Sequence, residues 1–184
     1  MAVIESTQQL IPTGTWAVDP THSHVEFAVR HMKIATVKGR AAAFSAMLDS
    51  TGPEPTLEGV VQAASITTYD EQRDGHLASP EFFDSERFPE IEFRSTSFDE
   101  TGGKDLRIVG EITIKGVTKE IELAGSFTGA GVDPWGNDRT GLDLTGVIDR
   151  RDFGLAWNAP IPGGGFLVDD DVKVSASFSF VRKS

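Results

Sequence analysis

The chain has 184 residues, which is enough for one domain with a sizeable hydrophobic core. It carries 28 Asp and Glu against 17 Lys and Arg, so its net charge of −11 repels phosphate backbones, and nucleic acid is not an expected partner. The chain has no cysteine, which excludes disulfides, thiolate zinc sites and cysteine nucleophiles.

We expect residues 1–15 to form a flexible tail and residues 16–184 to form a single domain. The first basic side chain is Arg30, which leaves the N-terminus without the charged part of a signal peptide. No apolar run approaches the roughly 20 residues that a membrane span needs, so we expect no stable membrane insertion. The simplest expectation is a soluble, cytoplasmic protein.

Eight segments alternate apolar and polar residues with the two-residue period of half-buried strands. They are residues 24–32, 37–48, 57–68, 90–98, 106–114, 121–127, 139–148 and 172–180. Short turns connect most of them, and no long segment has a helical period. The pattern predicts an all-β domain of eight antiparallel strands, either an up-and-down barrel or a sandwich.

Small residues in the middle of the apolar strand faces favour a barrel with a hollow interior. They are Ser95, Gly110, Gly125, Gly146 and Ala176. The interior of an eight-stranded barrel is just wide enough for side chains or for one small ligand, so small residues there indicate a cavity. The alternative is that the glycines only permit the sharp coiling that barrel closure requires.

The segment 67–93, between the third and fourth predicted strands, is rich in charge and in phenylalanine. Ser79 is a typical N-cap and is followed by a proline and an acidic residue, which predicts a short helix carrying Phe82 and Phe83. One of the two rings should enter a core and the other should lie at a rim or mouth. A second short helix is expected before the last strand.

Histidine is the residue type that most invites a catalytic or metal-binding interpretation. His22 and His24 would share a strand face, but this spacing alone is weak evidence, and we expect no metal and no cofactor. An enzyme acting on a small amphiphile would use His31 or His76 as a general base. Nucleophile motifs and phosphate-binding loops are missing from the sequence, so we expect no catalytic residues.

Two charged groups flank the aromatic residues of the non-strand segments. Arg73 and Asp74, together with Arg150 or Arg151 and Asp152, are expected to form a buried network that fixes the segment 67–93 to the barrel. The alternative is that these side chains anchor the polar end of a ligand.

Four motifs, spread over nearly the whole chain from about Trp16, resemble the YceI-like family of lipocalin-like, polyisoprenoid-binding proteins. They are Asp19-Pro20-Thr21-His22-Ser23 with Val25-x-Phe27 and His31; Arg73-Asp74-x-His76-Leu77-x-Ser79-Pro80-x-Phe82-Phe83-Asp84 with Phe88-Pro89-x-Ile91-x-Phe93; Gly110-x-Ile112-Thr113-Ile114-x-Gly116-Val117-Thr118; and Arg150-x-Asp152-Phe153-Gly154. The order and spacing of these motifs are specific.

The resemblance implies an eight-stranded, lipocalin-like up-and-down barrel whose lumen holds the chain of an isoprenoid or isoprenoid-quinone-like amphiphile. It also implies non-catalytic binding, storage or transport, because the family has no agreed catalytic apparatus. Phe88 stands where many relatives have tyrosine, which removes a hydroxyl that could meet a ligand head group. Many relatives also carry a secretion signal of a kind that this sequence does not show.

From the strand pattern and the resemblance we expect a ligand-binding wall and a polar mouth or anchor. The expected wall is Val25, Phe27, Val29, His31, Phe82, Phe83, Ile91, Phe93, Leu142, Leu144, Phe153 and Phe178; the expected mouth or anchor is Arg73, Asp74, His76, Arg150 and Asp152. The alternatives are the histidine-dependent enzyme and a ligand-free, stress-associated structural protein whose lumen is filled by side chains. A homodimer is an open alternative to a monomer.

Overall fold

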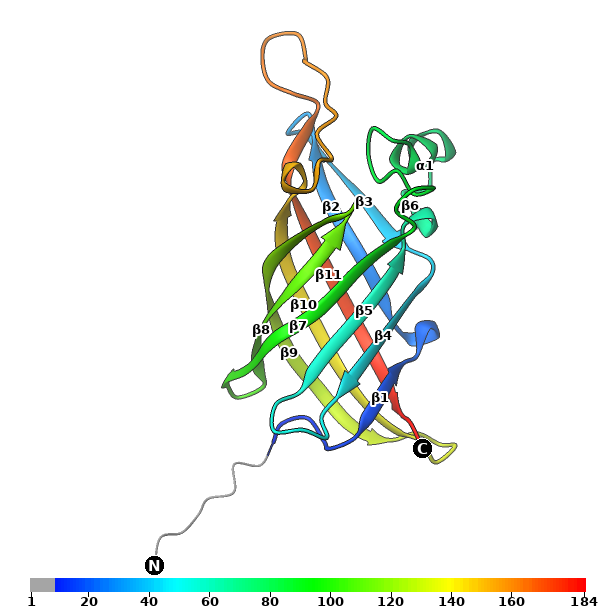
Figure 1. Ribbon diagram of the computed structural model, residues 1–184, viewed down its shortest axis with the longest axis vertical. Coiled ribbons are helices and arrows are strands. Elements are labelled where there is room, and N and C mark those ends of the chain that lie inside the picture. The colour runs from blue at the N-terminus through cyan, green and yellow to red at the C-terminus, as the bar shows by residue number, and fades with distance from the viewer. Residues whose placement is uncertain (1–8) are drawn as a thin grey trace, which may run out of the picture.

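The computed structural model describes residues 9–184, which form a closed, eight-stranded antiparallel β-barrel (Figure 1). The strands are β1 (Thr15–Val18), β2 (His24–His31), β3 (Ala35–Ala41), β4 (Phe44–Asp49), β5 (Thr56–Gln62), β6 (Ile66–Thr67), β7 (Glu90–Gly102), β8 (Asp105–Ile114), β9 (Val117–Val132), β10 (Asp138–Asp149) and β11 (Val168–Arg182). The barrel has eight strands because β3 and β4 are two parts of one strand, and because the short strands β1 and β6 only add to these parts. Apart from β1 and β6, barrel neighbours follow one another in the sequence, and β11 pairs back with β2. The predicted up-and-down barrel is therefore confirmed, and the alternative of a sandwich is wrong.

One predicted strand, residues 37–48, is divided into β3 and β4. β3 pairs with β2 and β6, whereas β4 pairs with β5 and β1. At the break, the backbone amides of Ala42 and Ala43 donate to the carbonyl and the hydroxyl oxygen of Ser65. The break lets one long strand change neighbours halfway. The short strand β1 joins β4 to β11 beyond His24, where β2 begins.

The helix in the segment 67–93 lies earlier than predicted, at α1 (Glu71–Ala78). Asp70 is its N-cap, accepting a hydrogen bond from the Arg73 amide at 2.9 Å. Ser79 ends the helix, because its hydroxyl donates to the His76 carbonyl at 2.6 Å and a proline follows. The prediction that Ser79 begins a helix is wrong, and Phe82 and Phe83 lie in turns after it.

The predicted short helix before the last strand is present as a 3₁₀ turn, Arg150–Phe153, whose N-cap is Asp149. Of the helices within residues 9–184, none combines the length and the apolar character needed to cross a bilayer.

The expected flexible tail of residues 1–15 needs correction at its C-terminal side. Residues 1–8 lie outside the described residues. Ile11, however, is 1% exposed and packs in the barrel core, and the Gly14 amide donates to the Ser50 hydroxyl at 3.0 Å. The side chain of Ile11 therefore closes this end of the barrel, although the residues around it in the sequence are of mixed polarity.

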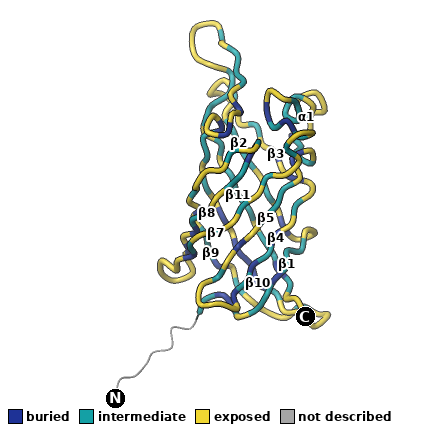
Figure 2. Tube along the Cα trace, in the orientation of Figure 1, coloured by how far each residue is buried: buried dark blue, intermediate teal, exposed yellow. Residues whose placement is uncertain are grey.

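The barrel interior has two differently filled halves. The packed end, near β1 and the C-terminus, is filled by large side chains that include Trp16, Leu48, Leu142 and Phe180. Figure 2 shows buried stretches around β1 and β10. The hollow end, toward α1, has a smaller core of Phe82, Ile114, Phe153 and Leu155.

Candidate functional site

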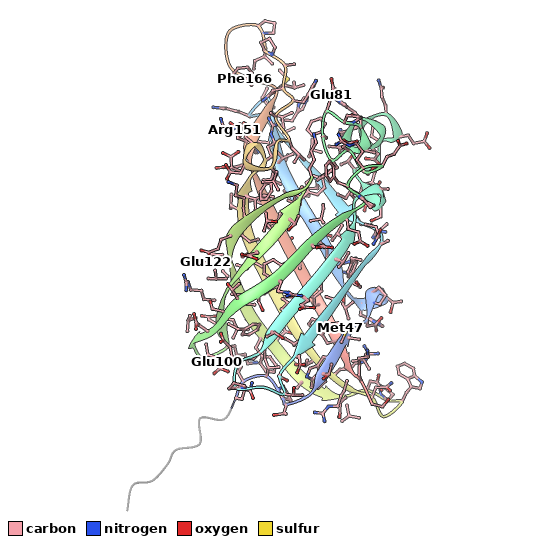
Figure 3. The ribbon with its side chains drawn as sticks, in the orientation of Figure 1. Met47, Glu81, Glu100, Glu122, Arg151 and Phe166 are labelled. Atoms are coloured by element: carbon pink, nitrogen blue, oxygen red, sulfur yellow. The ribbon has the colours of Figure 1, made fainter. Side chains whose placement is uncertain are left out.

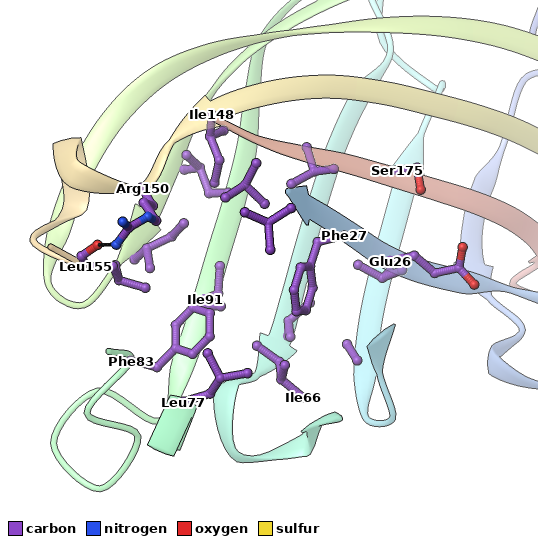
Figure 4. A pocket seen from close by; sticks show the side chains of 18 of the residues that line it. Glu26, Phe27, Ile66, Leu77, Phe83, Ile91, Ile148, Arg150, Leu155 and Ser175 are labelled. Atoms are coloured by element: carbon purple, nitrogen blue, oxygen red, sulfur yellow. Dashed lines mark hydrogen bonds between the residues drawn. The ribbon is translucent and has the colours of Figure 1, made fainter. Parts of the chain in front are cut away.

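A cavity of about 830 Å³ occupies the hollow end of the barrel. Its walls are the inward faces of the strands, where residues two apart share a face. On β2 these are Val25, Phe27 and Val29, all half-buried because their inner sides border the cavity. Figure 4 shows the ring of Phe27 on one side of the cavity, with Phe83 and Ile91 on another. The cavity reaches exposed Arg73, where it meets solvent.

Glycines shape this cavity differently from the prediction. A Cβ on Gly39 would clash with the ring of Phe27, and one on Gly110 would lie 2.5 Å from the ring of Phe93. Gly146 is covered in the same way by Leu123. The space above these three glycines is therefore filled by side chains. The predicted cavity is present, but of the small residues that indicated it only Ala176 lines it. At Gly39 and Gly110 the missing side chain leaves room for the rings of Phe27 and Phe93 against the wall, and the centre of the barrel stays open.

The predicted apolar wall residues, with one exception, line the cavity. Those that do so are Val25, Phe27, Val29, His31, Phe82, Phe83, Ile91, Phe93, Leu144, Phe153 and Phe178. The exception is Leu142, which is fully buried in the packed end and faces Phe127 and Phe178 on the neighbouring strands. Leu142 and Leu144 share a face, but they lie at different depths along the barrel. That these residues contact a ligand stays a prediction.

An aromatic cluster lies at the solvent end of the cavity. The ring of His76 meets the rings of Phe82 and Trp157 edge-on, at centroid distances of 5.0 and 4.6 Å. The His76 Nε2 atom also pairs with the carboxylate of Glu81. Trp157 was not among the predicted site residues. The sequence feature that could have identified Trp157 is its position among the uncharged residues that directly follow the Arg150 motif.

Arg150 is 5% exposed and holds together the chain between β10 and β11. Its guanidinium donates at 2.6–3.4 Å to the carbonyl oxygens of Leu155, Trp157, Val168 and Asp169 and to the carboxylate of Asp170. Burial lowers its pKa, although an arginine keeps its charge in proteins. With its donors engaged in this way, Arg150 fixes the loop instead of presenting a free donor to a ligand.

Asp74 fixes α1 to β6. Its carboxylate accepts hydrogen bonds from the hydroxyls of Thr67 and Thr68 and from the Thr68 amide, at 2.6–2.9 Å. Burial acts to raise its pKa, but the hydrogen bonds from Thr68 and Thr67 hold the pKa below its ordinary value. Asp74 does not line the cavity, whereas Arg73 does, with Nε and Nη2 bonded to Thr68.

The predicted single charge network is wrong. Asp152 is exposed and accepts no hydrogen bond from Arg150, which is instead bonded within residues 155–170. The Arg73 and Asp74 contacts lie on β6 and α1. Two separate networks therefore hold the two segments that border the cavity, because each arginine finds its acceptors in its own segment.

The remaining histidines do not converge. His22 lies on a 3₁₀ turn and pairs with the Asp19 carboxylate at 2.8 Å, while His24 is an exposed residue of β2. Among residues 9–184, no group of three or more His, Cys, Asp or Glu side chains is arranged to hold a metal ion.

Sequence comparisons give the chain close counterparts. A family model described as YceI-like domain matches residues 16–180. Two UPF0312 proteins of different Staphylococcus aureus strains are each 34% identical to the chain over 166 residues, covering 88% of it and 94% of the relative.

Solved structures with the same fold agree. BcnA of Burkholderia cenocepacia has a TM-score of 0.74 and 21% identity, covering 90% of this chain and 99% of its own. The YCEI protein of Campylobacter jejuni has a TM-score of 0.69 and 25% identity, covering 84% and 90%. A domain from Saccharophagus degradans, described as polyisoprenoid binding and implicated in plant cell wall breakdown, has a TM-score of 0.69 and 14% identity, covering 91% and 98%.

Proposed function

The chain belongs to the YceI-like family, and from that premise we propose that it binds the hydrocarbon chain of an isoprenoid lipid, such as an isoprenoid quinone, in the cavity of its barrel. Binding is non-catalytic and reversible in this proposal, so the protein stores or transports its ligand unchanged.

The observation that carries the proposal is the unfilled cavity of about 830 Å³ with apolar walls. This volume falls within the roughly 300–1,000 Å³ typical of small-molecule sites. Half-buried Val29, Ile91 and Phe93 leave apolar surface facing the cavity, and covering such surface supplies roughly 25 cal/mol per Å². A long, flexible hydrocarbon chain is the ligand that this surface favours.

The ligand class is supported by the solved domain of the same fold that is described as polyisoprenoid binding. Branched methyl groups along such a chain suit walls built from aliphatic and aromatic side chains. The quinone is the finer part of the proposal, since a quinone ring would stack readily on the aromatic cluster of His76, Phe82 and Trp157.

Polar groups at the mouth would meet the head group. Arg73 uses Nε and Nη2 to hold Thr68, while its Nη1 donates to no residue of the described chain. His31 lines the cavity near the end of β2. A carbonyl or hydroxyl oxygen at the end of the lipid would accept a hydrogen bond from these side chains.

The two alternatives have less support. A lumen filled entirely by side chains is inconsistent with the cavity, although it describes the packed end correctly. For the enzyme, His76 is the better placed histidine, but its ring pairs with the Glu81 carboxylate, and no serine or threonine hydroxyl of the described residues is bonded to it.

The test is uptake by variants of two phenylalanines from the same segment. Phe83 lines the cavity, while Phe88 packs beside Gly116 and does not. The protein is mixed with dispersed geranylgeraniol or a short-chain isoprenoid quinone, separated by gel filtration and extracted. We expect Phe83→Asp to lose most of its lipid uptake and Phe88→Asp to keep it. The two variants should have similar melting temperatures. Equal losses of uptake and stability in both variants would show that Phe83 is only a core residue.

A further inference from the structure

A stretch without charge lies at the mouth of the hollow end. Residues 155–168 contain no Asp, Glu, Lys or Arg, although 24% of the whole chain is charged. We call this stretch the neutral loop. It connects the 3₁₀ turn Arg150–Phe153 to β11 and projects well beyond the barrel, as the orange segment at the top of Figure 1.

The neutral loop is an ordered hairpin. The amide of Leu167 donates to the Ala159 carbonyl at 2.9 Å, and the amide of Ile161 donates to the Gly165 carbonyl at 3.1 Å. Gly163 to Gly165 have φ values of 89–103°, a backbone region that favours glycine and makes the tight tip. Pairing within the loop, together with two prolines that lack an amide hydrogen, leaves few backbone donors in need of water.

The outer surface of the loop is apolar and continues onto a neighbouring turn. Phe166 is 62% exposed (Figure 3), and in the β2–β3 turn Ile34 is 77% and Met32 39% exposed. The amide of Met32 donates to the Leu167 carbonyl at 2.7 Å, which fixes the two segments side by side. The two adjoining segments thus expose three apolar side chains to water, and we call them the apolar tip.

Charged residues border the neutral loop and the turn beside it. Asp170 pairs with Arg150 and Arg151, at 3.4 and 3.3 Å, at the base of the loop. Lys33 is the charged residue of the β2–β3 turn and pairs with no acidic residue of the described chain. The Arg30 guanidinium also donates to the carbonyl oxygens of Lys33 and Ile34, so the turn itself carries positive charge. The net charge of −11 on the whole protein nevertheless repels an anionic lipid surface, which favours a neutral or zwitterionic one.

We propose that the neutral loop and the β2–β3 turn form a membrane-contacting surface that enters the head-group region of a bilayer of neutral or zwitterionic lipids. Leu155, Trp157 and Leu167 belong to the loop and also line the cavity. The surface thus places the cavity mouth against the bilayer, so that a lipid chain moves between the two without crossing water. This inference takes the lipid cargo from the proposed function, but contact with the membrane is measured on protein to which no cargo has been added.

The absence of cysteine makes a direct test simple, because a single introduced cysteine is labelled uniquely. Phe166→Cys and Trp135→Cys are each labelled with an environment-sensitive fluorophore and mixed with phosphatidylcholine vesicles. Trp135 is the matched control, since it is 82% exposed but lies in the β9–β10 turn at the packed end. We expect a blue shift at position 166 and none at 135. Equal shifts, or none at 166, would overturn the proposal.

A second experiment measures vesicle flotation of unlabelled variants. We expect the Ile34→Ser, Phe166→Ser double variant to bind vesicles at least about tenfold more weakly than the parent, because two apolar side chains are no longer buried in the bilayer. Trp135→Ser should bind vesicles as the parent does. Equal flotation of all three proteins would refute the surface. So would shielding of the label at 166 without vesicles that grows with protein concentration, which would identify a second copy as the occupant. Uptake of dispersed geranylgeraniol, measured without vesicles, tests the cavity separately.

Discussion

The packed end and the hollow end of the barrel are built from the same strands but are filled differently. At the packed end, Trp16 from β1 and Ile11 before it close the barrel, and Leu48 and Phe180 are fully buried against them. At the hollow end, rings such as Phe27 lie against the wall over a glycine and leave the centre open. Alternation therefore makes a wall, while the depth and direction of each large side chain decide whether that wall encloses a core or a cavity.

This difference divides stability from binding. Close packing at one end gives each side chain many dispersion contacts, and their loss is costly. The half-buried side chains of the other end have fewer contacts, so they contribute less to folding and keep apolar surface for a ligand. Substitutions at the two ends should therefore affect different measurements.

The largest difference is expected between Leu142→Ala and Ile91→Ala. Leu142 is fully buried at the packed end, so its truncation should cost about 2–5 kcal/mol of unfolding free energy while lipid uptake remains. Ile91 borders the cavity, so its truncation should cost clearly less and weaken uptake. Urea unfolding and gel-filtration uptake measure the two quantities. Similar stability losses at both positions would remove the distinction between the ends.

Arg150→Met tests what holds the mouth of the hollow end. The variant leaves four carbonyl acceptors without their donor, and we expect a loss of roughly 3 kcal/mol together with faster amide hydrogen exchange across residues 155–168. Exchange in β1 and β4 at the packed end should change only as far as global stability does. Uniform acceleration over the whole barrel would show that Arg150 does not act locally.

Gly39→Ala tests whether a ring lying on a glycine keeps the cavity open. The new methyl group would clash with the ring of Phe27 and push it toward the centre, so we expect a loss of about 2 kcal/mol and reduced uptake. Gly75→Ala is the control, because nothing lies within 4 Å of its added methyl group and alanine favours the α1 helix. Undiminished uptake by Gly39→Ala would mean that Phe27 does not limit the cavity.

The smallest effect expected is that of Asp74→Ala, which removes the hydrogen bonds between α1 and β6. Because the pKa of Asp74 is lowered on folding, its contribution is present above the unfolded value of about 3.9 and is lost as the pH falls through the folded value. We expect a cost of about 1 kcal/mol at pH 7 that shrinks below pH ~4. A difference from the parent that stays constant down to pH ~2 would show that the carboxylate charge is not involved.

Much of the barrel could be predicted from the sequence because strand alternation is a local signal. The apolar faces of β2 and β10 identified inward residues, and the strand order followed from short connections. Depth along the barrel could not be predicted in this way. Leu142 and Leu144 have the same phase, yet only Leu144 borders the cavity, because strand tilt and the closing side chains of the packed end are set by tertiary structure.

The connections were harder to predict for a physical reason. Ser79 followed by proline fits either end of a helix, and the better N-cap, Asp70, decided the outcome through its bond to Arg73. Arg150 was expected to pair with a neighbouring carboxylate, but backbone carbonyls of a folded loop took its donors. Such acceptors carry no sequence signature, so the two separate networks could not be foreseen.

The claim that the hollow end holds a lipid is tested most directly by native mass spectrometry of the intact protein as purified, followed by organic extraction of whatever is released. The account predicts an added mass that the extract identifies as an isoprenoid lipid, together with its loss from Phe83→Asp and its retention in Phe88→Asp. A folded protein that carries no lipid and takes up no added isoprenoid quinone would contradict it.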